Sequence, residues 1–278
     1  MRVTRIADDF RRARRADVPL LVALDIDGTL VGQDRAIPPT TLQAVAAAAA
    51  AGHHLVLATG RSIVGLLPVA RALGIFPGWA VASSGSVIVR LDLGVRAGYV
   101  VEEAHTFDVE PLVRLVDESA SDLMLAVEEL GWGYRTSARL PDGFLNGPQR
   151  VVPLEEIWSR RATRVILRGS GVTDLVGAVC ALGLTATRSG PDSVDVTPFG
   201  LSKATALEKV RERLGVARGN TIAVGDNYND IDMLRWAARS VAMGHAPPDL
   251  LAIAGEVTGT IHEHGVVGVL RSITPGAY

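Results

Sequence analysis

The sequence of 278 residues contains a single cysteine, Cys180. One cysteine cannot form a disulfide within the chain, which argues against a disulfide-stabilised secreted protein. Cys180 stands among apolar neighbours in the order Val-Cys-Ala-Leu, and we expect it to be a small buried hydrophobe. The chain is therefore expected to work in the cytoplasm.

Long apolar runs and a strong charge imbalance are also missing. No stretch of about 18 purely apolar residues occurs, so the sequence predicts no membrane span. The formal net charge is −2, and no overall basic field attracts nucleic acid. Aromatic residues make up only 5% and are too scattered to form a stacking platform for bases. Residues 1–17 carry arginines interrupted by aspartates and are expected to form a polar, solvated leader. We predict neither a nucleic-acid nor a membrane partner.

Short apolar strands that alternate with helices dominate both ends of the chain. Residues 20–24 form a continuous apolar run, typical of a strand buried on both faces of a parallel sheet. A helix opened by prolines, a strand over 54–58 and a helix ending near Gly74 follow. The same order returns later, with strands expected over 193–197, 221–224 and 240–243. This rhythm predicts an α/β fold with a doubly wound parallel sheet.

The pattern changes between about residues 85 and 188. Strand candidates over 86–90, 122–128 and 164–168 mix polar with apolar residues, which we interpret as the alternation of an antiparallel sheet with one open face. Helices expected over 109–119 and 172–182 separate them. We therefore predict a core domain of residues 18–84 and 189–278, interrupted by an inserted α+β cap domain over 85–188.

Two carboxylates follow the first predicted strand directly, in Asp25-Ile26-Asp27-Gly28-Thr29. Residues i and i+2 of an extended chain project to the same face, and ligands of open α/β sheets lie at the carboxyl ends of strands. A divalent cation would offset the repulsion of the two carboxylates. One could then act as a nucleophile and the other as general acid and base. Gly28 permits a tight turn, and Thr29 offers a hydroxyl and a backbone N–H to an oxyanion. For this motif alone, an ordinary Asp-Gly turn is the alternative.

A second acidic loop, Gly225-Asp226-Asn227-Tyr228-Asn229-Asp230, follows the strand expected over 221–224. A calcium loop of the EF-hand type needs glycine at its sixth position, where the two acidic loops have Ile231 and Leu30. Helix capping is an alternative for Asn229 or Asp230. It does not explain Asp226.

Two further residues complete the candidate site. Of 28 basic residues only Lys203 and Lys209 are lysines. Lys203 begins a predicted helix, a position at which the helix dipole disfavours a cation. An ammonium group that balances the charge of a carboxylate and of a phosphate oxygen would explain a lysine there. Thr59 stands between a strand end and a helix N-terminus, which is a good oxyanion site, although threonine also caps helices.

Taken in order, these segments resemble the four motifs of the haloacid dehalogenase-like (HAD) superfamily: Asp25-Ile26-Asp27-Gly28-Thr29, Thr59-Gly60-Arg61, Lys203 and Gly225-Asp226-x-x-Asn229-Asp230. The first motif is similar to that of the phosphatase members. An insertion between the second and third motifs is similar to the Cof-type group, which has an α+β (C2-type) cap. The resemblance runs from about Leu20 to Leu270 and rests, within the cap, on placement and length. Ser84-Gly85 and His245-Ala246 depart from it, because Cof-type sequences commonly have Asn-Gly and Asn-Ala there.

The resemblance implies a Mg²⁺-dependent phosphomonoester hydrolase that forms an aspartyl-phosphate on Asp25. Asp25 would also bind the metal, and Asp27 would serve as acid and base and ligate the metal through its backbone carbonyl. Asp226 would complete the protein ligands, with Asp230 supporting the metal site. Thr59 and Lys203 would hold the phosphoryl oxygens. The residues expected to bind substrate are Thr29, Gly60, Arg61 and Asn229.

The substrate stays open at this point. By the resemblance it is a small phosphorylated metabolite, with a sugar phosphate first and a flavin or pyridoxal phosphate second. A phosphomutase on the same scaffold and a non-catalytic sensor of a phosphorylated metabolite are alternatives, although a sensor would usually lack the nucleophile or the acid. Arg135, Arg139 and Arg150 are candidates for holding a second anionic group, or else belong to a solvated surface.

Overall fold

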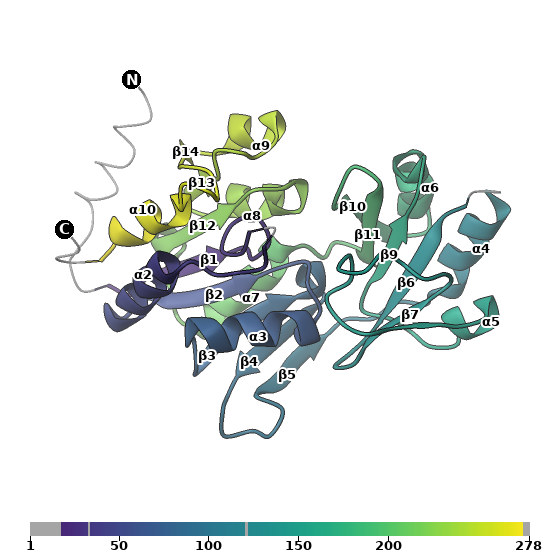
Figure 1. The fold of residues 1–278 in the computed structure, drawn as a ribbon, viewed down its shortest axis with the longest axis horizontal. Coiled ribbons are helices and arrows are strands. Elements are labelled where there is room, and N and C mark those ends of the chain that lie inside the picture. The colour runs from purple at the N-terminus through teal and green to yellow at the C-terminus, as the bar shows by residue number, and fades with distance from the viewer. Residues whose placement is uncertain (1–17, 33, 120–121, 275–278) are drawn as a thin grey trace.

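The computed structural model describes residues 18–32, 34–119 and 122–274, so the arginine-rich leader lies outside the described residues. Two sheets lie side by side, one of eight strands and one of six (Figure 1). The chain passes from the larger sheet to the smaller one after Ala104 and returns after Pro198. None of the described helices is long and apolar enough to cross a membrane.

The larger sheet has the strand order β14-β13-β12-β1-β2-β3-β4-β5. Its strands from β14 to β3 are parallel, whereas β4 and β5 pair antiparallel at one edge. Their bounds are β1 (Leu21–Leu24), β2 (His54–Ala58), β3 (Gly78–Ala82), β4 (Val87–Leu91), β5 (Tyr99–Ala104), β12 (Thr221–Gly225), β13 (Arg239–Ala242) and β14 (Glu256–Val257).

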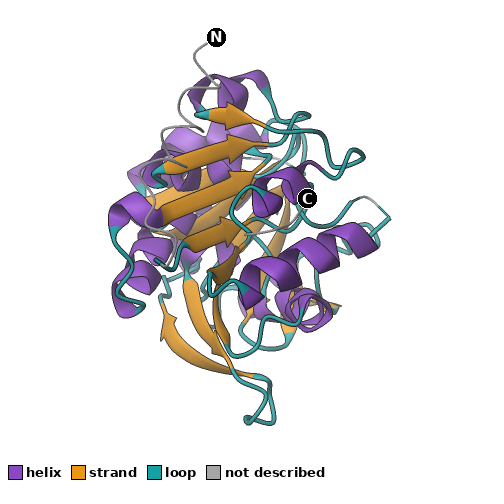
Figure 2. Cartoon of the chain, turned by 90° about the vertical axis from the view of Figure 1, so that its left-hand side faces the viewer, coloured by secondary structure: helices purple, strands orange, loops and turns teal. Residues whose placement is uncertain are grey.

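Helices cover both faces of this sheet, as Figure 2 also shows. Alternate residues of β1 serve the two sides: Val22 and Leu24 enter one hydrophobic core, and Leu21 and Ala23 enter the other. The first core packs against α2 (Pro39–Ala50), α3 (Ile63–Leu73) and α10 (Gly265–Arg271). The second packs against α7 (Lys203–Arg213), α8 (Ile231–Trp236) and α9 (Pro248–Ile253). The predicted doubly wound α/β fold is confirmed.

The smaller sheet has the order β10-β11-β9-β6-β7-β8 and is antiparallel except between β7 and β8. One face packs against the helices α4 and α6, and the other carries Tyr134 and Ile166 toward the larger sheet. We call this sheet with its helices the cap. Its elements are α4 (Glu110–Glu118), β6 (Met124–Glu129), β7 (Gly133–Thr136), β8 (Gln149–Val151), α5 (Leu154–Ile157), β9 (Val165–Arg168), α6 (Val176–Ala181), β10 (Leu184–Arg188) and β11 (Ser193–Pro198).

The strand pairing differs from the expected domain limits at both ends of the insertion. The strand expected over 86–90 was assigned to the insertion, but as β4 it pairs with β3 in the larger sheet. The strand expected over 193–197 was assigned to the core, but as β11 it pairs with β9 and β10 in the cap. Alternation in sequence reveals that one face of a strand is open, and it does not reveal which strand lies beside it.

The environment expected for Cys180 is wrong, because this thiol lies on the exposed side of α6. Val179 is the buried residue of that short helix. A helix of this kind buries only one stripe of its surface, so an apolar neighbourhood in sequence does not ensure burial at each position.

Candidate active site

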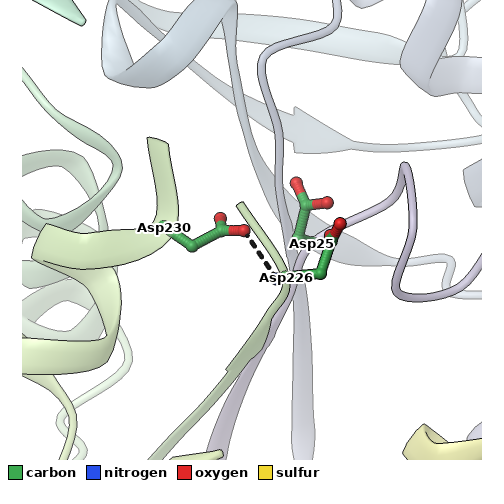
Figure 3. A group of neighbouring side chains, drawn as sticks. All are labelled: Asp25, Asp226 and Asp230. Carbon is green, nitrogen blue, oxygen red and sulfur yellow. Dashed lines mark hydrogen bonds between the residues drawn. The ribbon is translucent and has the colours of Figure 1, made fainter. Parts of the chain in front are cut away.

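Three carboxylates meet at the carboxyl ends of two neighbouring strands (Figure 3). Asp25 follows β1 and Asp226 follows β12, and these strands pair directly, with Leu24 opposite Val224. Oxygens of Asp25, Asp226 and Asp230 all lie within 4.8 Å of one another. Asp25 is only 4% exposed. The structure thus brings together the acidic residues of the first and last motifs, which are about 200 positions apart in the chain.

Lys203 provides the positive charge in this cluster. Its Nζ donates to Asp25 Oδ1 and to Asp230 Oδ1, at 2.6 Å each. The helix it begins, α7, is capped by the Ser202 side chain, which accepts from the backbone N–H of Thr205. Burial lowers the pKa of Lys203, but the two carboxylates outweigh burial and the net shift is upward. Burial also raises the pKa of Asp25, against the opposing effect of Lys203.

Asp230 organises the loop around it. Its Oδ1 accepts from Lys203, and its Oδ2 accepts from the backbone N–H groups of Asp226 at 2.9 Å and Asn227 at 3.1 Å. A side chain on Gly225 would come within 2.5 Å of the Asp230 carboxyl carbon, so this position requires glycine. With both oxygens occupied, Asp230 holds Lys203 and the Asp226 loop in place.

Asp226 is surrounded by residues of the first motif and by His245. The Thr29 hydroxyl donates to Asp226 Oδ1 at 3.2 Å, and His245 Nε2 lies 3.6 Å from Oδ2. Burial raises the pKa of Asp226, and contact with this carboxylate raises the pKa of His245. Gly28, at φ +86°, must be glycine because a Cβ would stand 2.2 Å from Asp226 Oδ2. Thr29 was expected to bind substrate, but its hydroxyl is directed at Asp226.

Asp27 projects toward solvent, with 58% of its side chain exposed. Arg61 donates hydrogen bonds to both carboxylate oxygens of Asp27, through Nε at 2.8 Å and Nη2 at 2.5 Å. Its third donor, Nη1, donates to the backbone carbonyl of Gly65 at 3.1 Å. Such a bidentate pair fixes the carboxylate in orientation as well as position. Arg61 was expected to contact substrate, and its guanidinium instead holds Asp27.

Thr59 follows β2 in a tight loop. Its hydroxyl accepts from the backbone N–H of Arg61 at 3.1 Å, and its carbonyl accepts from the N–H of Ser84 at 3.1 Å. Gly60 lies between Thr59 and Arg61 in the chain. The side-chain amide of Asn229 approaches Gly60, with Nδ2 3.4 Å from the position that a Cβ on Gly60 would take. Thr59, Gly60 and Asn229 are therefore together beside Asp25, as the sequence predicted.

A cavity of about 160 Å³ lies between the cap and this cluster. Its core side is formed by Asp25, Asp27, Thr59, Gly60, Arg61, Asn227 and Asn229, and its cap side by Tyr134, Phe144, Leu145, Asn146, Arg164, Ile166, Ser189, Ser193 and Asp195. The cap is docked on the core at this point, because the Ser62 hydroxyl donates to the Asn146 carbonyl at 3.2 Å. The arrangement forms a partly open cavity in which the carboxylates of Asp25 and Asp27 face the cap.

The cap residues of this cavity differ from those predicted. Arg135 is buried against Glu129 and Glu156, while Arg139 and Arg150 form exposed pairs with Asp142 and Glu156. Within the described residues, Arg164 is the arginine that the cap contributes to the cavity wall. The missed signal was strand alternation: Val165 and Leu167 face the cap core, so Arg164 and Ile166 must face the other way. The same holds for Ser193 and Asp195 in β11.

The donors at the strand ends suit a hard divalent cation. Asp25 and Asp226 present carboxylate oxygens, and the grouping lacks the sulfur and imidazole ligands that a zinc site would use. Asp25 Oδ2 accepts no hydrogen bond from the other residues described, whereas both oxygens of Asp230 do. Such an oxygen set matches the preference of Mg²⁺, which keeps several waters and binds few carboxylates.

The family model of haloacid dehalogenase-like hydrolases matches residues 22–142 and 171–270, which is more than half of the chain. The chain belongs to this family. It is 29% identical to pyridoxal phosphate phosphatase YbhA of Escherichia coli, over 86% of this chain and 93% of that protein. It is 26% identical to 5-amino-6-(5-phospho-D-ribitylamino)uracil phosphatase YcsE of Bacillus subtilis, over 93% of this chain and 97% of that protein. The solved structure of the HAD phosphatase BT1666 from Bacteroides thetaiotaomicron superposes with a TM-score of 0.78 at 27% identity. The match covers 95% of this chain and 98% of that chain. This HAD hydrolase is therefore of the Cof-type phosphatase group.

Proposed function

We propose that this HAD hydrolase is a Mg²⁺-dependent phosphomonoester hydrolase that forms an aspartyl-phosphate on Asp25. The observation that carries the proposal is the setting of Asp25. One oxygen of this buried carboxylate is held by Lys203, and the residue lines the cavity between core and cap beside Thr59. A nucleophile fixed in this way attacks with little reorganisation.

In the first step the free oxygen of Asp25 forms a bond to phosphorus while the bond to the leaving oxygen breaks. Asp27, which must be protonated on one oxygen for this step while Arg61 holds the other, donates that proton to the leaving oxygen. In the second step water attacks the phosphorus of the aspartyl-phosphate, Asp27 accepts the proton, and Asp25 leaves as a carboxylate. Thr59, the N–H groups near Gly60 and Lys203 neutralise the phosphoryl oxygens in both steps.

Asp25, the backbone carbonyl of Asp27 and Asp226 would hold the cation, with Asp230 fixing the loop behind them. When bound, Mg²⁺ supplies positive charge to the phosphoryl group as it is transferred. Arg61 keeps Asp27 aligned through its two hydrogen bonds.

A sugar phosphate is the first candidate substrate. The names of the relatives favour a second candidate, a pyridoxal phosphate or a flavin precursor. Phe144, Leu145 and Ile166 in the cavity wall can contact a ring in either class. A phosphomutase remains the alternative on the same scaffold, and release of free phosphate from unrelated phosphoesters distinguishes the two.

The proposal is tested by assaying phosphate release from a panel of phosphorylated metabolites with Mg²⁺, for the wild type and for Asp25→Asn. The amide keeps the shape of the side chain but is a poor nucleophile, so turnover is expected to fall by at least about three orders of magnitude. Circular dichroism of both proteins checks that the fold is kept. Activity of Asp25→Asn within tenfold of the wild type would refute the role of Asp25.

A further inference from the structure

The cap wall of the cavity contains one arginine held between two carboxylates. Arg164 donates through Nε to Glu128 Oε2 at 3.0 Å, through Nη1 to Asp195 Oδ2 at 3.0 Å and through Nη2 to the Tyr134 hydroxyl at 2.8 Å. All four side chains are buried. The positive charge of Arg164 is thus offset by two carboxylates, Glu128 and Asp195, at hydrogen-bond distance.

This arrangement decides the sign of the charge that a leaving group meets. Arg164 contributes one positive charge, whereas Glu128 and Asp195 contribute two negative ones, so the group is net anionic. The other charged pair of the cavity, Arg61 with Asp27, is neutral. Among the described residues, the cavity wall contains no further lysine or arginine. A second phosphate or a carboxylate on the substrate would therefore enter a site without a free cation.

Asp195 also offers an unused acceptor. Its Oδ2 is taken by Arg164 and by the Ser84 hydroxyl at 2.7 Å. Its Oδ1 accepts no hydrogen bond from the residues that the structure describes, although the side chain lines the cavity and the residue is only 3% exposed. Because the Asp195 side chain lines the cavity, this acceptor is open to a hydroxyl or amine of the substrate.

The position of Asp195 is fixed from the core side of the cavity. Ser83 donates to Glu128 Oε1 at 2.6 Å and Ser84 donates to Asp195, so both cap carboxylates are held by one turn of the core. Asp195 Oδ2 stands 3.6 Å from where a Cβ on Gly60 would lie. Asp195 is therefore next to the loop proposed to hold the phosphoryl group, within reach of the first atoms of the leaving group.

We propose that Asp195 is a specificity-determining residue, and that it selects phosphomonoesters whose leaving group is uncharged or cationic and carries a hydroxyl or amine near the ester. Esters with a second anionic group are rejected. This inference rests on the proposed phosphatase function and narrows its substrate to polyol, sugar or amine-bearing phosphates.

A matched pair of substrates tests it directly on the wild-type protein. D-Erythritol 4-phosphate and D-erythronate 4-phosphate differ only in a terminal hydroxymethyl or carboxylate group. We expect kcat/KM for the erythritol ester to be at least about tenfold higher, since like charges disfavour the erythronate ester. Equal or reversed preference would overturn the inference without requiring any variant to fold.

Two variants locate the effect. Asp195→Asn removes the negative charge and is expected to bring the ratio of the two kcat/KM values to within about threefold. Asp192→Asn is the matched control, because Asp192 is 44% exposed, pairs with Arg168 outside the cavity, and should leave the ratio unchanged. A ratio that is the same in Asp195→Asn and the wild type would overturn the role of Asp195.

Turnover of p-nitrophenyl phosphate separates this inference from the phosphatase proposal, because that ester has neither a second anion nor a hydroxyl. Hydrolysis of p-nitrophenyl phosphate together with a preference for the erythronate ester would refute the selectivity alone. Absence of phosphate release from all three esters would contradict both.

Discussion

Replacing Lys203 by methionine probes the buried charge cluster most sharply. The ammonium lies between Asp25 and Asp230, each 2.6 Å away, and all three side chains are nearly or fully buried. Methionine has a similar length and no charge. The substitution therefore leaves two carboxylates facing each other in a site that water scarcely reaches.

The expected loss follows from these contacts. Each pair is worth about 6 kcal/mol of Coulomb attraction at an effective dielectric constant of ~20, but removing three charges from water offsets most of this gain. Deleting one partner of a buried ion pair typically costs roughly 3–5 kcal/mol. We expect a loss of that size in the free energy of unfolding of Lys203→Met at neutral pH without divalent cations.

Lowering the pH reduces the difference in the free energy of unfolding between the wild type and Lys203→Met. Burial raises the folded pKa of Asp25 and Lys203 opposes that rise, so the folded pKa climbs further once the ammonium is gone. A group with a raised folded pKa contributes stability that is complete below the unfolded pKa and is lost as the pH rises through the folded pKa. The variant is therefore penalised most at neutral pH and least near pH ~4.

Urea unfolding monitored by circular dichroism in EDTA measures both effects. Lys209→Met is the matched control, because Lys209 is the second of the two lysines, is 41% exposed and pairs with Glu103. Its loss should stay within ~1 kcal/mol. Equal losses for the two variants at neutral pH would refute the account of Lys203.

Three further outcomes are expected. EDTA should stop phosphate release and Mg²⁺ should restore it, because Asp25 and Asp226 need a cation between them, while Ca²⁺ should inhibit through its looser coordination; full activity in metal-free protein would contradict this. Arg61→Met should lower kcat about tenfold on an alkyl phosphate and less on p-nitrophenyl phosphate, whose leaving group needs little protonation; equal losses would argue against Arg61 aligning Asp27. Hydrogen bonding from Lys209 lowers the pKa of Glu103 from 4.5 to about 2, so its stabilisation is complete above pH 4.5 and is lost as the pH falls toward 2. Glu103→Gln should therefore cost roughly 1 kcal/mol in urea unfolding at neutral pH and nothing near pH ~2, and a constant difference would be inconsistent with this ion pair.

The strands of the catalytic edge were predictable because their signal is local. A strand buried on both faces needs an unbroken apolar run, and the runs before Asp25 and Asp226 match β1 and β12 closely. Because the carboxyl ends of parallel strands lie at the same edge of a sheet, the α/β fold class itself brings Asp25 and Asp226 together. The buried lysine was also visible, because the helix dipole disfavours a cation at a helix start unless nearby anions balance its charge.

The assignment of strands to sheets was less predictable because pairing is non-local. The strand at 193–198 alternates polar and apolar side chains and joins the cap, whereas the strand at 87–91, which is apolar except for Arg90, joins the larger sheet. The cap arginines illustrate the same point. Arg135 and Arg164 are both buried, and only the sheet face that each occupies separates them. The alternation around Arg164 contained that information, and the charged residues alone did not.

Trapping the phosphoryl group on the protein during turnover tests most directly whether Asp25 is the nucleophile. Wild-type protein is mixed with excess p-nitrophenyl phosphate and Mg²⁺, quenched in acid within milliseconds, digested and analysed by mass spectrometry. We expect a phosphorylated peptide that contains Asp25, is labile to hydroxylamine and is absent from Asp25→Asn. Phosphate release at the normal rate with no phosphorylated peptide, or with the group on another residue, would contradict this role of Asp25.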